Sequence, residues 1–122
     1  KIRSFICVHF KIKNFGVIIS DSGLLPLKSG VIAVAQGYAG FKGIKSYQGK
    51  RDIFGKKFMY SKINVADSLA TSAALCMGEG KEQRPFALIT DAPVVFTKKI
   101  KRRELIINPK KDIYAPLFNK LS

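Results

Sequence analysis

Two aspartates, Asp21 and Asp67, stand where the sequence pattern expects a structural element to end or to begin. Asp21 follows a short apolar run, and Asp67 falls in the first turn of a predicted helix that comes directly after another apolar run. Sites are often built at such positions, and Mg²⁺ is usually held by one or two carboxylates together with nucleotide phosphates. Both residues are therefore candidate metal ligands. A structural interpretation stays open, because an Asp at a strand end caps a turn and an Asp in a first helical turn complements the helix dipole.

A second candidate is the basic, turn-rich stretch 46–57. Lys50 and Arg51, together with backbone amides of this stretch, could bind phosphate. A solvated surface loop has the same composition, so both interpretations stay open. The glycines nearby do not form a dinucleotide-binding fingerprint, and the sequence contains no GxxxxGK[ST] phosphate loop.

Histidine and cysteine chemistry has little support in this sequence. His9 is the single histidine and lies on the apolar face of the first predicted helix, which argues against a Ser-His-Asp or Cys-His mechanism. Cys7 and Cys76 are far apart and have no CxxC spacing, so they and one histidine cannot supply four zinc ligands. We expect two buried free thiols, which fits a reducing cytoplasm.

The elements that must position these residues follow from hydrophobic spacing. It predicts a helix over 1–11 and a second over 65–77, the latter capped by Asn64 and ended by Gly78. The predicted strands are 15–20, 31–36, 58–65, 86–90 and 104–107, and a short helix interrupted by a proline is predicted over 112–121. This order predicts an α+β fold of mixed layers, in which the small-residue helix 65–77 packs on a sheet of short strands.

The net charge of +14 predicts anionic partners or simple solubility. Most basic residues are scattered between apolar positions, and only KKIKRR at 98–103 forms a dense block. The sequence shows no RNA-binding or helix-turn-helix pattern, so nucleic acid is not the partner that we favour. The longest apolar runs fall far short of the roughly 20 residues that span a bilayer, and we expect a cytoplasmic protein without membrane contact.

Three stretches occur in an order that resembles one family. They are VIISDSGLLPLKSGVIAVAQGYAGF, YQGKRDIFGKKF and NVADSLATSAALCMGEG. Together they resemble the gamma-glutamyl ligases that extend the deazaflavin coenzyme F420, and the bacterial relatives of these ligases. The resemblance covers about residues 15–90 and corresponds to the second half of such ligases. It implies that 1–122 is a single domain forming the C-terminal part of a longer ligase-like chain.

The resemblance also implies an activity. Such ligases use GTP and Mg²⁺ or Mn²⁺ to activate a substrate carboxylate as an acyl phosphate, which the amine of L-glutamate attacks to form an amide. It assigns Asp21 and Asp67 to the metal, whose carboxylates should then converge, and it implies a homodimer. The residues assigned to the nucleotide are Ser22, Lys28, Lys50 and Arg51. No catalytic acid or base can be named.

Two departures from the family pattern keep other functions open. Ser68 stands where the family has a glutamate, which removes a carboxylate from the metal site. Lys28 stands in the loop LLPLK where the family has arginine, and lysine lacks the bidentate grip of arginine on phosphate. The alternatives are a degenerate, non-catalytic relative that binds a nucleotide or an acidic partner, and a basic nucleic-acid-binding module.

Overall fold

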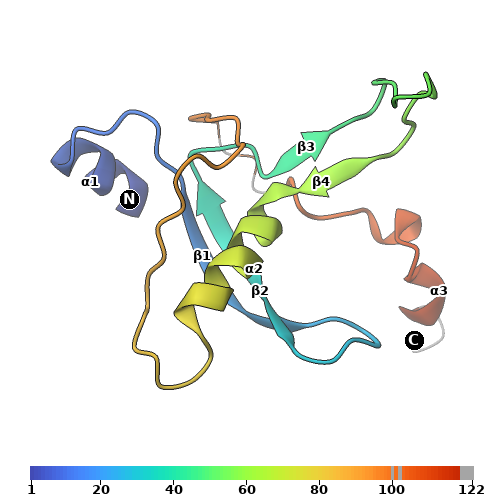
Figure 1. The fold of residues 1–122 in the computed structure, drawn as a ribbon. Helices are drawn as coiled ribbons and strands as arrows, with labels where there is room; N and C mark the ends of the chain where they lie inside the picture. Colours follow the sequence, from blue (N-terminus) through green and yellow to red (C-terminus); the bar gives the residue numbers. More distant parts are fainter. Residues whose placement is uncertain (100, 102, 119–122) are drawn as a thin grey trace.

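The computed structural model describes residues 1–99, 101 and 103–118. Two antiparallel hairpins and one long helix make up its centre (Figure 1). The elements in chain order are α1 (Ile2–His9), β1 (Val17–Leu24), β2 (Val31–Ala39), β3 (Ile44–Ser46), β4 (Lys62–Asn64), α2 (Val65–Met77), the 3₁₀ turn η1 (Pro109–Lys111) and α3 (Ala115–Phe118). This mixture of helices and short antiparallel strands is the α+β class that the sequence predicts.

The hairpin of β1 and β2 is longer than expected. Its register runs from the Val17–Ala39 pair to the Leu24–Val31 pair, with a bulge between Ile19 and Ser20. Asp21 pairs with Val34 inside the strand, so the prediction that Asp21 ends a strand is wrong. The strands are also more exposed than predicted, because a two-stranded sheet with α2 on one side leaves much of its surface uncovered.

Helix α2 begins and ends as predicted. The side chain of Asn64 accepts a hydrogen bond from the Asp67 amide, and Gly78 follows the last turn with a φ of 77°. Ala66 and Ala70 are 0% and 2% exposed, because small side chains let the helix approach β2 closely. Together with Phe41, Val65 and Ala33 they form the buried apolar core.

The second hairpin is irregular beyond its short strands. The amide of Tyr47 donates to the Ser61 carbonyl at 2.9 Å, and the amide of Gly49 donates to the Phe58 carbonyl at 3.0 Å. From the first of these bonds to the second, the chain advances two residues on one side and three on the other. This mismatch interrupts the ladder of hydrogen bonds between the strands. For this reason the predicted strand 58–65 is wrong except for β4.

The chain after α2 contains neither of the two strands predicted there. Residues 86–90 lack a strand partner, and 104–107 include a turn. Residues 94–97 instead run antiparallel to 40–42: the Lys42 amide donates to the Val95 carbonyl and the Thr97 amide to the Gly40 carbonyl, both at 2.9 Å. The predicted helix over 112–121 is reduced to α3, and positions 119–121 lie outside the described residues.

Helix α1 lies to one side of this centre (Figure 1). None of its residues is buried, and Phe5 and Val8 are 67% and 79% exposed. The Arg3 Nε donates to the Phe15 carbonyl at 2.7 Å and ties the helix to the start of β1. Both cysteines are free thiols, as predicted, but the prediction that they are buried is wrong: Cys7 is half-buried on α1, which has no buried residue, and Cys76 is exposed on α2. None of the helices in the described part of the chain has the length and hydropathy needed to cross a membrane.

Candidate functional site

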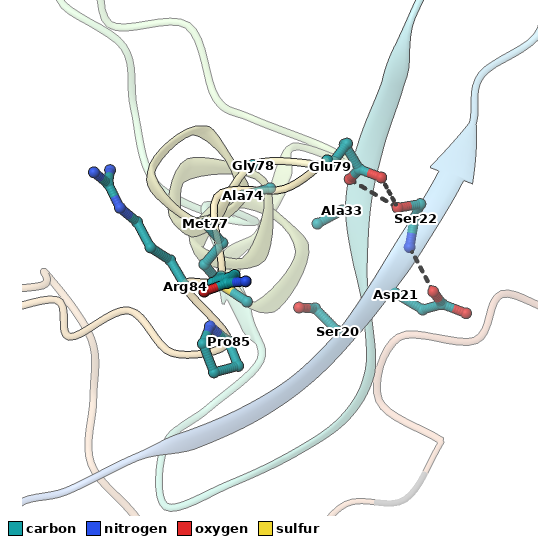
Figure 2. A pocket seen from close by; sticks show the side chains of 12 residues that line it. Ser20, Asp21, Ser22, Ala33, Ala74, Met77, Gly78, Glu79, Arg84 and Pro85 are labelled. Carbon is teal, nitrogen blue, oxygen red and sulfur yellow. Dashed lines mark hydrogen bonds between the residues drawn. The ribbon is translucent and has the colours of Figure 1, made fainter.

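An open groove of about 570 Å³ lies between the middle of β1 and the chain that follows α2. Strand β1 contributes Ser20, Asp21 and Ser22, and the chain after the helix contributes Glu79 and Arg84 (Figure 2). Residues of the first and third sequence motifs thus meet in space. The lining combines hydroxyl and carboxylate groups with apolar side chains such as Met77 and Pro85.

The contact that closes one side of the groove joins Ser22 to Glu79. The Ser22 hydroxyl lies 2.8 Å and 2.7 Å from the two Glu79 carboxylate oxygens and can donate its hydrogen to either one. Both side chains are exposed. In Figure 2 the Ser22 hydroxyl points to Glu79, whereas the Asp21 carboxylate points away from α2. Asp21 Oδ1 accepts the amide of Ser22 at 2.8 Å, which holds this carboxylate against its own strand.

The turn after α2 brings Glu79 back toward the sheet. Gly78 has a φ of 77°, a region that suits glycine, and a Cβ at this position would collide with the Glu82 carboxyl group. The Gly80 amide donates to Glu82 Oε2 at 2.8 Å and stabilises the turn. The glycine therefore determines where the Glu79 carboxylate lies.

Asp67 lies at the other end of α2 and has its own partners. Its Oδ1 accepts the Ala35 amide at 2.7 Å, and its Oδ2 accepts a short hydrogen bond from the Asn64 side chain. One turn further on, the Thr71 hydroxyl donates to the Ala33 carbonyl at 2.8 Å. Residues four apart lie on one helix face, so these two side chains together satisfy backbone groups of β2 that do not pair with β1.

The predicted site residues do not all come together. Asp21 and Ser22 line the groove described above, whereas Asp67 does not. Lys28 is exposed in the turn between β1 and β2, and Lys50 and Arg51 lie on the second hairpin, beyond the opposite end of β2. Convergence of Asp21 and Asp67 on one metal stays a prediction. Among the described residues, no three His, Cys, Asp or Glu side chains are grouped closely enough to hold a metal without further ligands.

Glu79 and Arg84 line the groove but were not selected from the sequence. The signal was present, because Glu79 completes the Met-Gly-Glu ending of the third motif. Its partner Ser22 is 57 positions away, and no periodicity in the sequence connects the two. The turn at Gly78, which is known only from the structure, directs the Glu79 carboxylate toward β1.

A second polar contact fastens the later part of the chain to the sheet. The Tyr38 hydroxyl donates to Glu104 Oε2 at 2.6 Å, and the Gly43 amide donates to the same oxygen at 2.9 Å. Burial and the neighbouring Glu104 carboxylate raise the pKa of Tyr38 to about 12, because each disfavours the charged phenolate. This contact lies away from the groove and serves the packing of residues beyond 91.

The fold and the groove define an α+β protein with a polar site built from two distant motifs. A sequence model of the family F420-0:Gamma-glutamyl ligase matches residues 1–91. The Coenzyme F420:L-glutamate ligase of Methanococcus maripaludis strain C7 is 36% identical over 102 residues, covering 84% of this chain and 41% of the relative. The protein of the same name from Methanocaldococcus jannaschii is 35% identical over 102 residues, which also cover 84% of this chain and 41% of the relative. The one from Archaeoglobus fulgidus is 35% identical over 77 residues, or 63% of this chain and 31% of the relative.

The chain belongs to the F420-0:gamma-glutamyl ligase family, as its motifs predict. It spans about two fifths of the length of the relatives from the two methanogens. The activity of a whole ligase is therefore a proposal for this chain.

Proposed function

We propose that this chain is part of a ligase that uses GTP and a divalent metal to form an amide bond between a substrate carboxylate and L-glutamate. Family membership supports the reaction class, since the curated relatives are named Coenzyme F420:L-glutamate ligase. The observation that carries the proposal is the groove in which Ser22 contacts Glu79, with Asp21 next to Ser22 in the same strand. It is open and lined by oxygen donors at the point where two family motifs come together.

The donors of this groove fit Mg²⁺ or Mn²⁺. Carboxylate and hydroxyl oxygens are the ligands that these hard cations prefer. Glu79 and the Ser22 hydroxyl face the groove, and the Asp21 carboxylate, which points away from α2 in the present state, would join them after its side chain turns toward the groove. Nucleotide phosphates complete such a site in many enzymes, so two protein carboxylates are sufficient. A bound metal would neutralise phosphate charge and polarise the reacting oxygen. We assign Asp21 as the first protein ligand, because its carboxylate is exposed and has one hydrogen-bond partner, the Ser22 amide.

Asp67 can contact a metal in the groove only by turning away from its present partners. Its carboxylate does not line the groove and instead accepts hydrogen bonds from Ala35 and Asn64. Its predicted role as a metal ligand is thus part of the proposal only in a rearranged, ligand-bound state. In the present state Asp67 positions α2 on β2.

The nucleotide contacts divide into two groups. Ser22 lies next to the proposed metal ligands, and Arg84 also lines the groove but points its guanidinium away from Ser22 and Glu79 (Figure 2). Lys28 is separated from Lys50 and Arg51 by the nine residues of β2, a length of roughly 30 Å. Within one copy of the chain, one nucleotide cannot contact both Lys28 at one end of β2 and Lys50 or Arg51 beyond the other end. We therefore propose that the triphosphate binds at the groove, with Lys28 as the nearer of the predicted cations along β1.

Titration calorimetry on the protein in its natural length tests this proposal. We expect GTP to bind only with Mn²⁺ present, and mass spectrometry to detect an amide when L-glutamate and the deazaflavin acid are added. Asp21→Asn should abolish both signals. Binding that needs no metal, or that survives Asp21→Asn unchanged, would contradict the assignment.

A non-catalytic relative is the second candidate. It is supported by Ser68, which supplies no carboxylate and whose hydroxyl donates to the Asn64 carbonyl at 2.6 Å. Leu24 and Leu25 are exposed, at 77% and 44%, in the loop where the family is polar and basic. Metal-dependent GTP binding without any amide product would favour this candidate over the ligase.

The cytoplasmic location and the homodimer are further proposals. GTP and L-glutamate are intracellular substrates, which supports the location. Exposed apolar side chains on α1 and in the turn of the first hairpin, such as Phe5 and Leu27, support a protein interface. Sedimentation of the natural-length protein tests the homodimer, and a monomer at micromolar concentration would contradict it.

A further inference from the structure

A second groove, of about 820 Å³, lies between the β3–β4 hairpin and the chain beyond residue 91. Its floor is apolar, with Ile44 and Val65 on one side and residues 105–107 on the other. Five lysines line it: Lys42, Lys45, Lys50, Lys62 and Lys101. One wall of this groove comes from residues 93–95, 101 and 104–107, beyond the end of the family model at residue 91.

Across the part of the chain that the structure describes, acidic side chains of the groove do not balance the charge of its five lysines. Glu104 is the one carboxylate among the described residues that line it, and its Oε2 accepts hydrogen bonds from Tyr38 and Gly43. Lys101 belongs to the dense basic block of the sequence, and the fold places it beside the lysines of the hairpin. The charge that is scattered along the sequence is therefore gathered here.

The hairpin extends this basic surface away from the body of the protein (Figure 1). Arg51, Lys56 and Lys57 continue it toward the tip, where all three are exposed. The nearby Asp52 carboxylate accepts the amides of Phe54 and Lys56, at 2.9 Å and 2.8 Å, and so holds the turn.

Aromatic side chains lie among these cations. The Lys45 and Lys50 Nζ atoms are each 5.4 Å from the centroid of the Tyr47 ring, within cation–π range. Phe54 and Tyr60 are 88% and 82% exposed. Single-stranded nucleic acids bind to grooves in which cations lie among exposed aromatic rings. Their phosphates pair with the cations, and their bases stack on the rings.

We propose that the lysine groove and the β3–β4 hairpin bind single-stranded nucleic acid without sequence preference. A free nucleotide carries too few phosphates to pair with the five groove lysines and the three cations of the hairpin tip. An acidic polypeptide would satisfy the lysines but offers no bases for the exposed Phe54 and Tyr60. This activity is independent of the proposed ligase site, which lies at the C-terminal end of α2, whereas the hairpin leads into its N-terminal end (Figure 1).

Fluorescence anisotropy with a labelled twelve-nucleotide oligo(U) tests the proposal on the present chain. With four phosphates neutralised, affinity should fall about 50-fold between 50 and 200 mM salt, following a logarithmic slope of about −2.8. The double variant Lys45→Ala/Lys62→Ala should reduce that slope by about 1.4. Phe54→Ala/Tyr60→Ala should weaken binding about tenfold with little change of slope.

The matched control removes two exposed lysines elsewhere, Lys110→Ala/Lys111→Ala in η1. It should leave the slope and the affinity within about twofold of the parent chain. Circular dichroism of each variant shows whether it remains folded. Equal weakening by the two lysine pairs would overturn the proposal, since it would indicate attraction to net charge alone. Competition by poly-L-glutamate or inorganic triphosphate as strong as that by unlabelled oligo(U) would overturn it too, in favour of an acidic polypeptide or a free phosphate ligand.

Discussion

The Ser22 hydroxyl lies 2.7 Å and 2.8 Å from the two carboxylate oxygens of Glu79, across 57 positions of sequence. This contact links the strand that carries Asp21 to the turn that ends α2. The first and third family motifs therefore lie side by side in the fold.

Glu79→Gln should weaken Mn²⁺-dependent GTP binding by at least about tenfold, because a neutral amide loses the charge that favours a cation. The free energy of unfolding should change by less than about 0.5 kcal/mol, since both side chains of the contact are exposed. Calorimetry and urea denaturation measure the two quantities. An unchanged GTP affinity would remove Glu79 from the site.

Asp21→Asn should abolish metal-dependent nucleotide binding while leaving stability unchanged within about 0.5 kcal/mol. Asp21 is exposed, and its hydrogen bond to the Ser22 amide can be kept by asparagine. Asp91→Asn is the matched control: Asp91 is exposed, lies outside the groove, and has a φ of 55° that asparagine tolerates. Both changes remove one carboxylate, so a loss seen in both would indicate a general charge effect.

Asp67→Ala should lower the free energy of unfolding by about 2 kcal/mol, because the Ala35 amide and the Asn64 side chain both lose a charged partner. Urea denaturation measures this loss. Ser72→Ala, on the exposed face of the same helix, should change stability by less than about 0.5 kcal/mol. If Asp67→Ala keeps its stability and loses only metal binding, Asp67 is a metal ligand and its structural role here is secondary.

Gly78→Ala should destabilise the protein by about 2 kcal/mol, because a φ of 77° with a ψ of 176° is a backbone region open almost only to glycine. The nearby Glu82 carboxyl group ends a flexible, exposed side chain that can move aside, so the loss comes from the backbone. The double variant Gly78→Ala/Glu82→Ala should therefore recover none of the loss in a thermal melt. Full stability of the single variant would mean that the turn has another conformation.

The Tyr38–Glu104 contact makes stability depend on pH in the alkaline range. The pKa of Tyr38 is raised from 10.0 to about 12 in the folded protein, so the folded state holds its proton more tightly than the unfolded state. The stability that this contributes is complete below pH 10 and is lost as the pH rises through about 12. Absorbance at the phenolate band should show one of the four tyrosines titrating late. Tyr38→Phe should eliminate that late step, and four tyrosines titrating together near their ordinary pKa in the parent chain would contradict it.

The local elements were largely predictable. Helix α2 has a capping Asn64, a small-residue face and a terminal Gly78, and all of these act within a few residues of one another. The predictions of strands at 86–90 and 104–107 were wrong because a strand depends on residues far away in the sequence. An apolar run becomes a strand only when a partner edge is available, and Asp67 and Thr71 already occupy the free edge of β2.

The sequence by itself determined the family, the α+β class and the candidate Asp21, because motif order and local caps are properties of neighbouring residues. The tertiary structure alone decided which charges share a site. It placed Glu79 on Ser22, gave Asp67 to the backbone of β2, and separated Lys50 from Lys28 by the length of a strand. Contacts between residues this far apart depend on how the turns direct the chain, and a one-dimensional pattern carries no record of those directions.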